Sequence, residues 1–326
     1  MMQMTKNNNA YWREREWQLK QLKNDDKFNS QLKRYYDQLI VGINKEIDRE
    51  AASLASRNET SIDNVRAAVT GTDISAYESE AQALAHQADL MRVAGHHVTY
   101  DDFSDEVNER MRIYNATMRI NRLELLKSQI GLRMIECGMQ VDQAVQDKVS
   151  KDYTDELKRQ AGILNVTAKN DQLWTSSDVA KQIMAQFNGT TFSQRIWANQ
   201  DALKATLDAV ISVGVIQGKN PRQMAKLLKD QVRSTINNHR YVTERIARTE
   251  SARVQHAAQV KSLTDNGYRW CKWYAESGAC RVCREIADSD PHGKGFGVYP
   301  VDKAPEIPVH PNCRCSISAF WSDKDA

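Results

Sequence analysis

The sequence predicts a mainly α-helical protein with an elongated N-terminal helical bundle, a helical middle domain and a small C-terminal tail that contains β-structure. Proline is absent before Pro221, and five of the six prolines lie between Pro291 and Pro311. Because proline interrupts helix interiors, the first 220 residues permit very long helices, whereas the C-terminal part requires another structure. Five of the six cysteines also fall in that part, between Cys271 and Cys315.

The first predicted region, residues 1–165, is a set of long amphipathic helices. From about Asn29 to Ser56, apolar side chains recur every three or four residues, which places them on one face of a helix about 40 Å long. These side chains are Leu32, Tyr35, Leu39, Ile43, Ile47, Ala51 and Leu54. The upstream segment Trp12–Leu22 is charged and aromatic, so we expect a docking helix that orders against a partner. Further stripes are expected over Tyr77–Met91 and Phe103–Met134, the second in one helix or two.

The second region, residues 166–266, is predicted to be a helical core with clear start signals. Thr175-Ser-Ser-Asp178 fits a capping box for a helix that continues to Phe187 and ends at Asn188-Gly189. Another helix is expected from Phe192. Asn220-Pro221 predicts the start of a third, because proline is favoured at the first helical position, and a last helix is expected over 238–266.

The third region, residues 267–326, is predicted to be a small tail with two strands. Tyr268–Tyr274 is rich in aromatic residues, and Cys313–Trp321 alternates in the same way. A loop rich in glycine and proline, Asp290–His310, separates them.

The cysteines of the tail predict a structural Zn²⁺ site. Cys280-Arg-Val-Cys283 is followed, after 26 residues, by His310-Pro-Asn-Cys313-Arg-Cys315. Tetrahedral Zn²⁺ takes four thiolate or imidazole ligands, and Cys-x-x-Cys supplies two of them. The preferred set is Cys280, Cys283, His310 and Cys313, with Cys315 as the main substitute. Disulfides and reduced core cysteines are the alternatives, although a cytosolic origin argues against disulfides. A tail of about 60 residues has too small a core to be stable without such a staple.

Two groups of charged residues give weaker predictions of function than the cysteines do. The formal net charge is only +3, but residues 219–253 contain nine Lys or Arg and three acidic residues. Six of these cations are candidate nucleic-acid contacts: Lys219, Arg222, Lys226, Lys229, Arg233 and Arg240. We expect them to be spaced around helices and not clustered. A basic, solvent-exposed face of an amphipathic helix is the more common explanation for such a pattern. Arg245, Arg248 and Glu250 form a candidate structural ion-pair node, for which a solvated helical face is the favoured alternative.

Other classes of function are not indicated by the sequence. No apolar run approaches the roughly 20 residues that span a bilayer, and the N-terminus lacks the apolar core of a signal peptide. We find no nucleophile elbow, phosphate-binding glycine loop or His-Glu-x-x-His motif. His96-His97 with Asp101-Asp102 is better explained as a surface turn than as a metal site. We therefore expect no enzymatic activity, no small-molecule substrate and no association with a membrane.

The order of motifs over residues 192–320 resembles the phage Mu F-like minor head protein family of tailed bacteriophages. The most specific elements are Ala247-Arg-Thr-Glu250 and His310-Pro-x-Cys-Arg-Cys315, and Cys280-x-x-Cys283 supports them. Two further elements, Phe192-x-x-Arg-Ile-Trp197 and Gly218–Leu228, precede them in the expected order.

This resemblance implies a minor capsid protein that is made in the host bacterial cytoplasm and resides in the virion, inside the head near the portal. Its partners would be the portal protein, the scaffold or major capsid protein, and genomic double-stranded DNA. It would assist procapsid assembly, DNA packaging or DNA ejection, with residues 1–165 docking on the portal. The alternative is a zinc-dependent enzyme or nuclease-like effector delivered with the genome, with His292, Asp288 and Asp290 as the nearby candidate bases.

Overall fold

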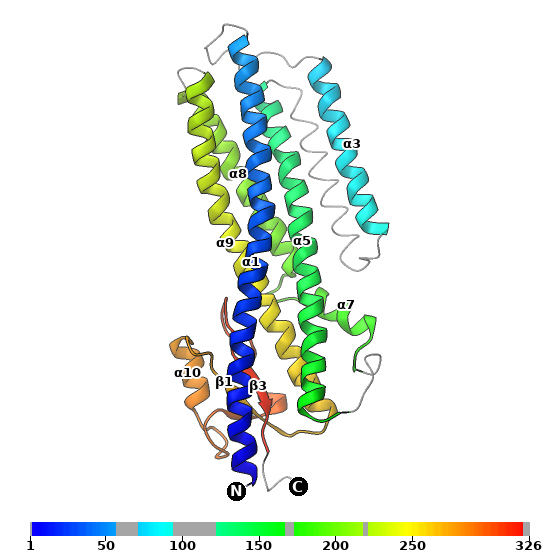
Figure 1. Ribbon diagram of the computed structural model, residues 1–326, viewed down its shortest axis with the longest axis vertical. Coiled ribbons are helices and arrows are strands. Elements are labelled where there is room, and N and C mark those ends of the chain that lie inside the picture. The colour runs from blue at the N-terminus through cyan, green and yellow to red at the C-terminus, as the bar shows by residue number, and fades with distance from the viewer. Residues whose placement is uncertain (1, 57–70, 94–121, 167–172, 218–220, 322–326) are drawn as a thin grey trace. The chain divides into compact units, whose positions relative to one another are not determined.

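The computed structural model describes residues 2–56, 71–93, 122–166, 173–217 and 221–321, and these are mainly helical, as predicted (Figure 1). The elements, in chain order, are α1 (Met2–Ser56), α3 (Gly71–Val93), α5 (Arg122–Ile163), α7 (Ser176–Met184), α8 (Phe192–Gln217), α9 (Pro221–Asp265), β1 (Trp270–Tyr274), α10 (Arg281–Asp288), β2 (Val298–Pro300), the 3₁₀ turn η1 (Val301–Lys303) and β3 (Ser316–Ala319). Among the described residues, no helix is both long enough and apolar enough to cross a membrane.

The chain divides into two compact units, each assembled from segments that are distant in sequence. Unit 1 consists of residues 1–30, 145–192 and 244–326, and unit 2 consists of 31–144 and 193–243. The divisions fall inside α1, α5 and α9, so each of these helices contributes to both units.

The first helix is longer than expected, because the segment Trp12–Leu22 is continuous with the predicted helix in α1. Within unit 1 this segment buries Trp17, and Glu14 is fully buried against Arg159 of α5 at 2.8 Å. The segment is therefore ordered within the chain itself, and its docking on a partner stays a prediction. Of its charged residues, Glu14 pairs with another helix, whereas Arg13, Glu16 and Lys20 are exposed.

Unit 2 is a helical bundle whose core confirms the predicted apolar stripes. In α1, Leu32, Leu39, Ile43, Ile47 and Ala51 are buried, while Tyr36 takes the buried place expected for Tyr35. Tyr77 and Leu84 of α3 pack with residues of α5 and α8 in one cluster.

An ion-pair network adds specific contacts between the helices of unit 2. Arg122, at the start of α5, binds Glu50 of α1 at 2.8 Å and Asp73 of α3 at 3.1 Å. The single arginine thus joins three helices.

Two helix boundaries differ from the sequence prediction. The Thr175 side chain accepts from the Asp178 N–H in the expected capping box, but α7 ends at Met184. Phe187 instead pairs with Thr190 across a turn in which Asn188 and Gly189 have positive φ. Further on, the two helices expected after Asn220 are one helix, α9, because nothing between them breaks a helix.

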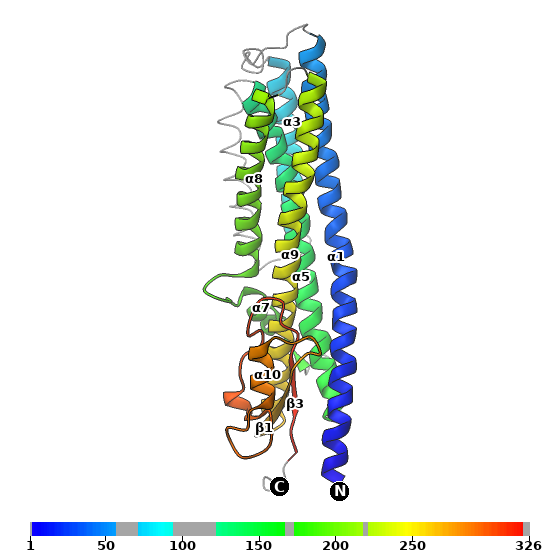
Figure 2. The same ribbon diagram turned by 90° about the vertical axis from the view of Figure 1, so that its left-hand side faces the viewer.

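The C-terminal part of unit 1 contains a three-stranded antiparallel sheet in the order β2-β1-β3. Cys271 pairs with Tyr299 of β2 and with Ala319 of β3. β1 and β3 confirm the two predicted strands, whereas β2 and α10 lie in the stretch between them. The helix α10 packs beside β1 (Figures 1 and 2).

Several sequence predictions fall outside the described residues. These are the His96-His97 and Asp101-Asp102 turn, the Phe103–Met118 stripe, Lys219 and the Asn220 cap.

Candidate metal-binding site

The Cys-x-x-Cys pair lies at the start of α10. Cys280 is the N-cap residue of this helix and is exposed, whereas Cys283 is fully buried in the first turn. The helical turn brings the two thiols to the same end of α10, where the unpaired backbone N–H groups favour negative charge.

The remaining candidate ligands come from the loop that leads into β3. The backbone reverses direction between His310 and Cys313, where Asn312 adopts a left-handed conformation with φ 69°. The Cys313 N–H closes this turn on the His310 carbonyl at 3.2 Å. Cys315 is the last residue before β3 and is buried.

The two segments meet with the spacing that a tetrahedral metal requires. His310 Nε2 is 3.3 Å from both Cys280 Sγ and Cys283 Sγ, and Cys283 Sγ is 3.9 Å from Cys313 Sγ. With bonds of about 2.3 Å to sulfur and about 2.0 Å to nitrogen, tetrahedral Zn²⁺ separates ligand atoms by about 3.8 Å for S–S and about 3.5 Å for S–N.

All five predicted ligands take part in this arrangement. Ligand atoms lie within 4.8 Å of one another in two groups, one of Cys280, Cys283 and His310, and one of Cys283, Cys313 and Cys315. Cys283 belongs to both groups. These clusters could hold a metal ion, and both Cys313 and Cys315 are placed to complete the coordination.

The imidazole of His310 has the orientation of a metal ligand. Its Nδ1 is 2.8 Å from the Pro311 carbonyl, a contact that requires Nδ1 to carry the proton. Nε2 then presents a lone pair to the two thiols. Backbone carbonyls commonly orient metal-binding histidines in this way.

The local electrostatics differ among the thiols. A hydrogen bond from the Cys315 side chain lowers the pKa of Cys313 to about 5, and the Cys283 N–H lowers the pKa of the Cys280 thiol. Burial raises the pKa of Cys283 to about 12. The pair Cys280 and Cys313 therefore favours the thiolate form that binds metals, and a metal would deprotonate Cys283 as well.

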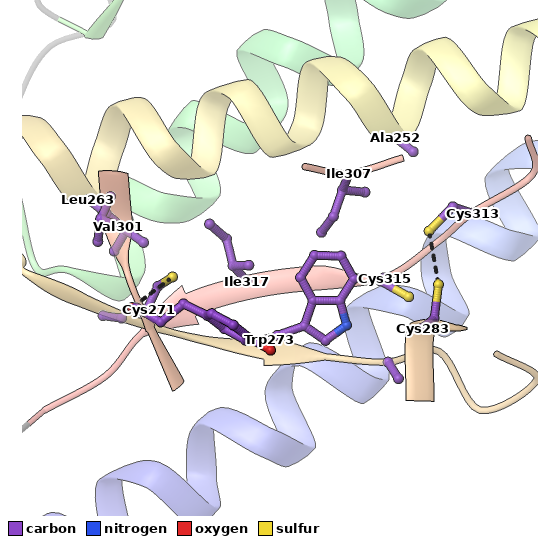
Figure 3. Close-up of a cluster of buried hydrophobic side chains, with 13 residues drawn as sticks. Ala252, Leu263, Cys271, Trp273, Cys283, Val301, Ile307, Cys313, Cys315 and Ile317 are labelled. Atoms are coloured by element: carbon purple, nitrogen blue, oxygen red, sulfur yellow. Dashed lines mark hydrogen bonds between the residues drawn. The ribbon is translucent and has the colours of Figure 1, made fainter. Parts of the chain in front are cut away.

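The cluster is built into the apolar core of unit 1. Figure 3 shows Cys283, Cys313 and Cys315 at one end of this core, next to Trp273 and below Ile307. Cys271 lies apart from them, at the other end of the same core, where its thiol donates to the Tyr299 carbonyl at 3.5 Å. Cys283, Cys313 and Cys315 therefore share one apolar core with residues of the sheet.

Residues 205–318, which include α9, the sheet and all the candidate ligands, match the family model described as phage Mu protein F like protein. This part of the chain is similar to the phage Mu F-like family. No curated protein and no solved structure matches the chain. The family suggests a protein of phage head morphogenesis and a location in the virion.

The Arg248-Thr-Glu250 motif of the phage Mu F-like region lies under the metal cluster. The Thr249 hydroxyl accepts from the Asn312 N–H at 3.1 Å, within the turn between His310 and Cys313. Glu250 is fully buried and pairs with Arg253 at 2.7 Å. Thr249 and Glu250 therefore do not lie on a solvated helical face, which differs from the favoured alternative for Glu250.

The arginines of the predicted ion-pair node have different surroundings. Arg248 lies 3.5 Å from Glu276 and 3.8 Å from Asp25, whereas Arg245 is exposed on the outer face of α9.

Arg314, between the last two cysteines, has a contact that sequence reasoning missed. Its buried guanidinium binds both carboxylate oxygens of Asp25 in α1, with Nε 2.8 Å from Oδ2. Asp25 precedes Arg314 by 289 residues, and no local signal in the sequence connects them.

The candidate nucleic-acid residues form a stripe in unit 2, contrary to the expectation that they are spaced around helices. At about 100° per residue, five of them fall within an arc of about 60° on α9. This basic stripe consists of Arg222, Lys226, Lys229, Arg233 and Arg240. Arg222, Lys226 and Arg233 are exposed, and Lys229 is 2.5 Å from Asp48 of α1.

Proposed function

We propose that this chain is a non-enzymatic minor capsid protein of a tailed bacteriophage. It docks at the portal vertex inside the head and assists procapsid assembly, DNA packaging or DNA ejection. The observation that carries the proposal is the phage Mu F-like match over 205–318, which spans the complete set of candidate metal ligands.

The metal in this proposal is a structural Zn²⁺. Thiolates and an imidazole suit Zn²⁺, and four protein ligands close a structural site, whereas a catalytic site keeps one position for water. Cys280, Cys283 and His310 would hold the ion together with Cys313 or Cys315. When bound, the ion supplies a cross-link between α10 and the loop before β3.

The alternative of a zinc-dependent effector requires an open coordination position and a base beside it. Two of its candidate bases have other contacts. The His292 ring packs edge-on against Trp270 and Tyr299, and Asp290 accepts from the Lys294 N–H at 2.9 Å. These contacts favour the structural role.

Docking on the portal is assigned to the exposed face of α1 in unit 1. Trp12 is 70% exposed and Leu19, two turns later, is 54% exposed. Tyr11 packs edge-on against Trp12, and Arg15 lies over the Tyr11 ring. Tryptophan, tyrosine and arginine are the residues most enriched at binding hot spots.

Replacing these two anchors should weaken portal binding by the full-length protein. We expect Trp12→Ala with Leu19→Ala to reduce affinity for the portal protein of the same phage by at least about 30-fold, because each buried anchor contributes 1 kcal/mol or more. Val213→Ala, which alters an exposed side chain of α8, serves as the control. Equal binding by the three proteins in surface plasmon resonance would contradict the assignment.

DNA binding is a second function that the basic stripe favours. Cations that contact phosphates release counterions, so each contact adds about one unit to the salt dependence of binding. We expect Arg222→Gln, Lys226→Gln and Arg233→Gln together to lower the slope of log K against log salt by about 3.

The control for the DNA experiment carries the same loss of charge elsewhere. Lys20, Lys23 and Lys27 are exposed on α1, and their replacement by Gln should leave the slope unchanged. Absence of DNA retention at every ionic strength tested would remove DNA from the proposal.

A further inference from the structure

Arg314 connects the candidate metal cluster to the first helix. It lies between Cys313 and Cys315, and its side chain is only 1% exposed. Two of its nitrogens bind the two oxygens of Asp25, and Nη1 donates to Gln255 Oε1 of α9 at 2.8 Å. Backbone that carries two candidate ligands is thus fixed, through one side chain, to α1.

In the described part of the chain, Asp25 is the only acidic partner of this guanidinium, and it is itself 4% exposed. The carboxylate also faces Lys148 of α5 at 3.5 Å and Arg248 of α9 at 3.8 Å. A buried guanidinium that loses its carboxylate is strongly unfavourable. Movement of α1 away from this position would therefore disfavour the observed conformation of the loop at Arg314.

Thr249 supports the same loop from α9. Its hydroxyl accepts from the N–H of Asn312, at the left-handed residue that reverses the chain between His310 and Cys313. Both ligands on this turn depend on that reversal. Two buried side chains outside the cluster, Asp25 and Thr249, thus set the geometry of the second half of the site.

We infer that Asp25 and Thr249 are positioning residues of the metal site. We also infer that metal binding is energetically linked to the packing of α1 against the rest of unit 1. The inference rests on the proposed metal site. Groups that orient metal ligands change the affinity for the metal by about 10–100-fold. Linkage is reciprocal, so the metal must strengthen the packing of α1 in unit 1 by the same factor as that packing strengthens metal binding.

The first test follows hydrogen exchange of the full-length protein with Zn²⁺ and after chelation. We expect chelation to speed exchange about 10-fold or more in peptides covering residues 12–25 and 310–319. Peptides of α8 serve as the internal reference and should not change.

The metal content of the same sample separates the two possible failures. One bound Zn²⁺ with unchanged exchange in residues 12–25 overturns the linkage alone. A protein that binds no Zn²⁺ overturns the metal site and the linkage together.

The second test measures Zn²⁺ affinity by competition with a chromophoric chelator. We expect Asp25→Asn to weaken Zn²⁺ binding by about 10-fold or more, because the amide keeps the shape but removes the charge that holds Arg314. Asp26→Asn changes the same chemistry at an exposed neighbour in the same helix and should stay within about twofold of the wild type. Equal affinities for the two variants overturn the inference.

A pair of variants at Thr249 covers the case in which Asp25→Asn does not fold. Thr249→Val keeps the shape and removes the acceptor of the Asn312 N–H, so it should also weaken Zn²⁺ binding. Thr249→Ser keeps the hydroxyl and should restore it. A valine variant that folds, by circular dichroism, and binds Zn²⁺ as tightly as the serine variant overturns the role of Thr249.

Discussion

His256 is a half-buried histidine of α9 in unit 1. Its Nδ1 finds no hydrogen-bond partner among the described residues. Burial alone lowers the pKa of this imidazole to about 4, against about 6.5 in an unfolded chain. The unfolded state therefore takes up a proton at a higher pH than the folded state, and the free energy of unfolding must fall as the pH drops from about 6.5 towards 4.

Replacing His256 should remove this contribution to acid sensitivity. Between pH 6.5 and pH 5 the wild type should lose up to about 2 kcal/mol more of its unfolding free energy than His256→Gln, since each pKa unit corresponds to about 1.4 kcal/mol. Urea unfolding curves at several pH values measure the difference. If the two proteins lose stability in parallel, His256 is not the group that carries the dependence.

Between elements, the contact of α5 with α8 in unit 2 depends on a glycine. A Cβ at Gly138 would lie 2.8 Å from the Trp197 ring, and that ring is 2% exposed. The two helices can therefore approach closely only where this side chain is absent. Glycine costs helix stability by itself, so its place in the middle of α5 reflects packing.

A methyl group at Gly138 should destabilise unit 2. We expect Gly138→Ala to lower the free energy of unfolding by about 1–3 kcal/mol through overpacking. Gly162→Ala, in the same helix but with no atom within 4 Å of its Cβ, should be neutral or stabilising by up to about 1 kcal/mol. Thermal or urea unfolding of both variants checks the sign, and equal effects would mean that Trp197 can move aside.

The elements also show which information the sequence carries locally. The Thr175 capping box, the start of α9 at Pro221 and the strands β1 and β3 were predictable, because a few adjacent residues determine each of them. The candidate ligands could be named because Cys-x-x-Cys followed by His-x-x-Cys-x-Cys is a spacing typical of Zn²⁺ sites. The strand β2 has only three residues, which is too short for a periodic signal.

Contacts between distant segments could not be predicted in this way. The segment Trp12–Leu22 has the polar composition of a solvated helix, yet Glu14 and Gln18 are buried because Arg159, Tyr274 and Ser316 satisfy them. A single sequence does not pair a glutamine with a carbonyl 256 residues away. Only Arg240 of the basic stripe depends on α9 being one continuous helix, because the other four residues lie in the helix predicted to start at Pro221.

For the whole molecule, the candidate metal cluster lies in unit 1, and none of its candidate ligands belongs to unit 2. A ligand that binds only the folded state stabilises it by RT ln(1 + [L]/Kd), which is about 4 kcal/mol at a thousandfold excess over Kd. The core of unit 1 includes Cys283, Cys313 and Cys315. Metal should therefore affect the unfolding of the two units unequally.

Calorimetry with and without a chelator should reveal this difference. Chelation should lower the midpoint of the transition that reports the sheet of unit 1, and Cys283→Ser should abolish the response to Zn²⁺. Cys137→Ala, at a buried cysteine of unit 2, should keep the response. A response lost equally in both variants would show that the effect does not come from the cluster.

The division of the chain also has a consequence for synthesis on the ribosome. Unit 1 needs residues 1–30 and residues 244–326, and Asp25 meets Arg314 only after 289 further residues have been added. At 5–20 residues per second, that interval is roughly 15–60 s. During this time Asp25 lacks Arg314, although its partner Lys148 and the Arg159 partner of Glu14 are added earlier. Residues 31–144 already supply more than half of the residues of unit 2. The contact between Asp25 and Arg314 therefore forms late, so a nascent chain that stalls before Arg314 exposes a part of α1 that chaperones or proteases can recognise.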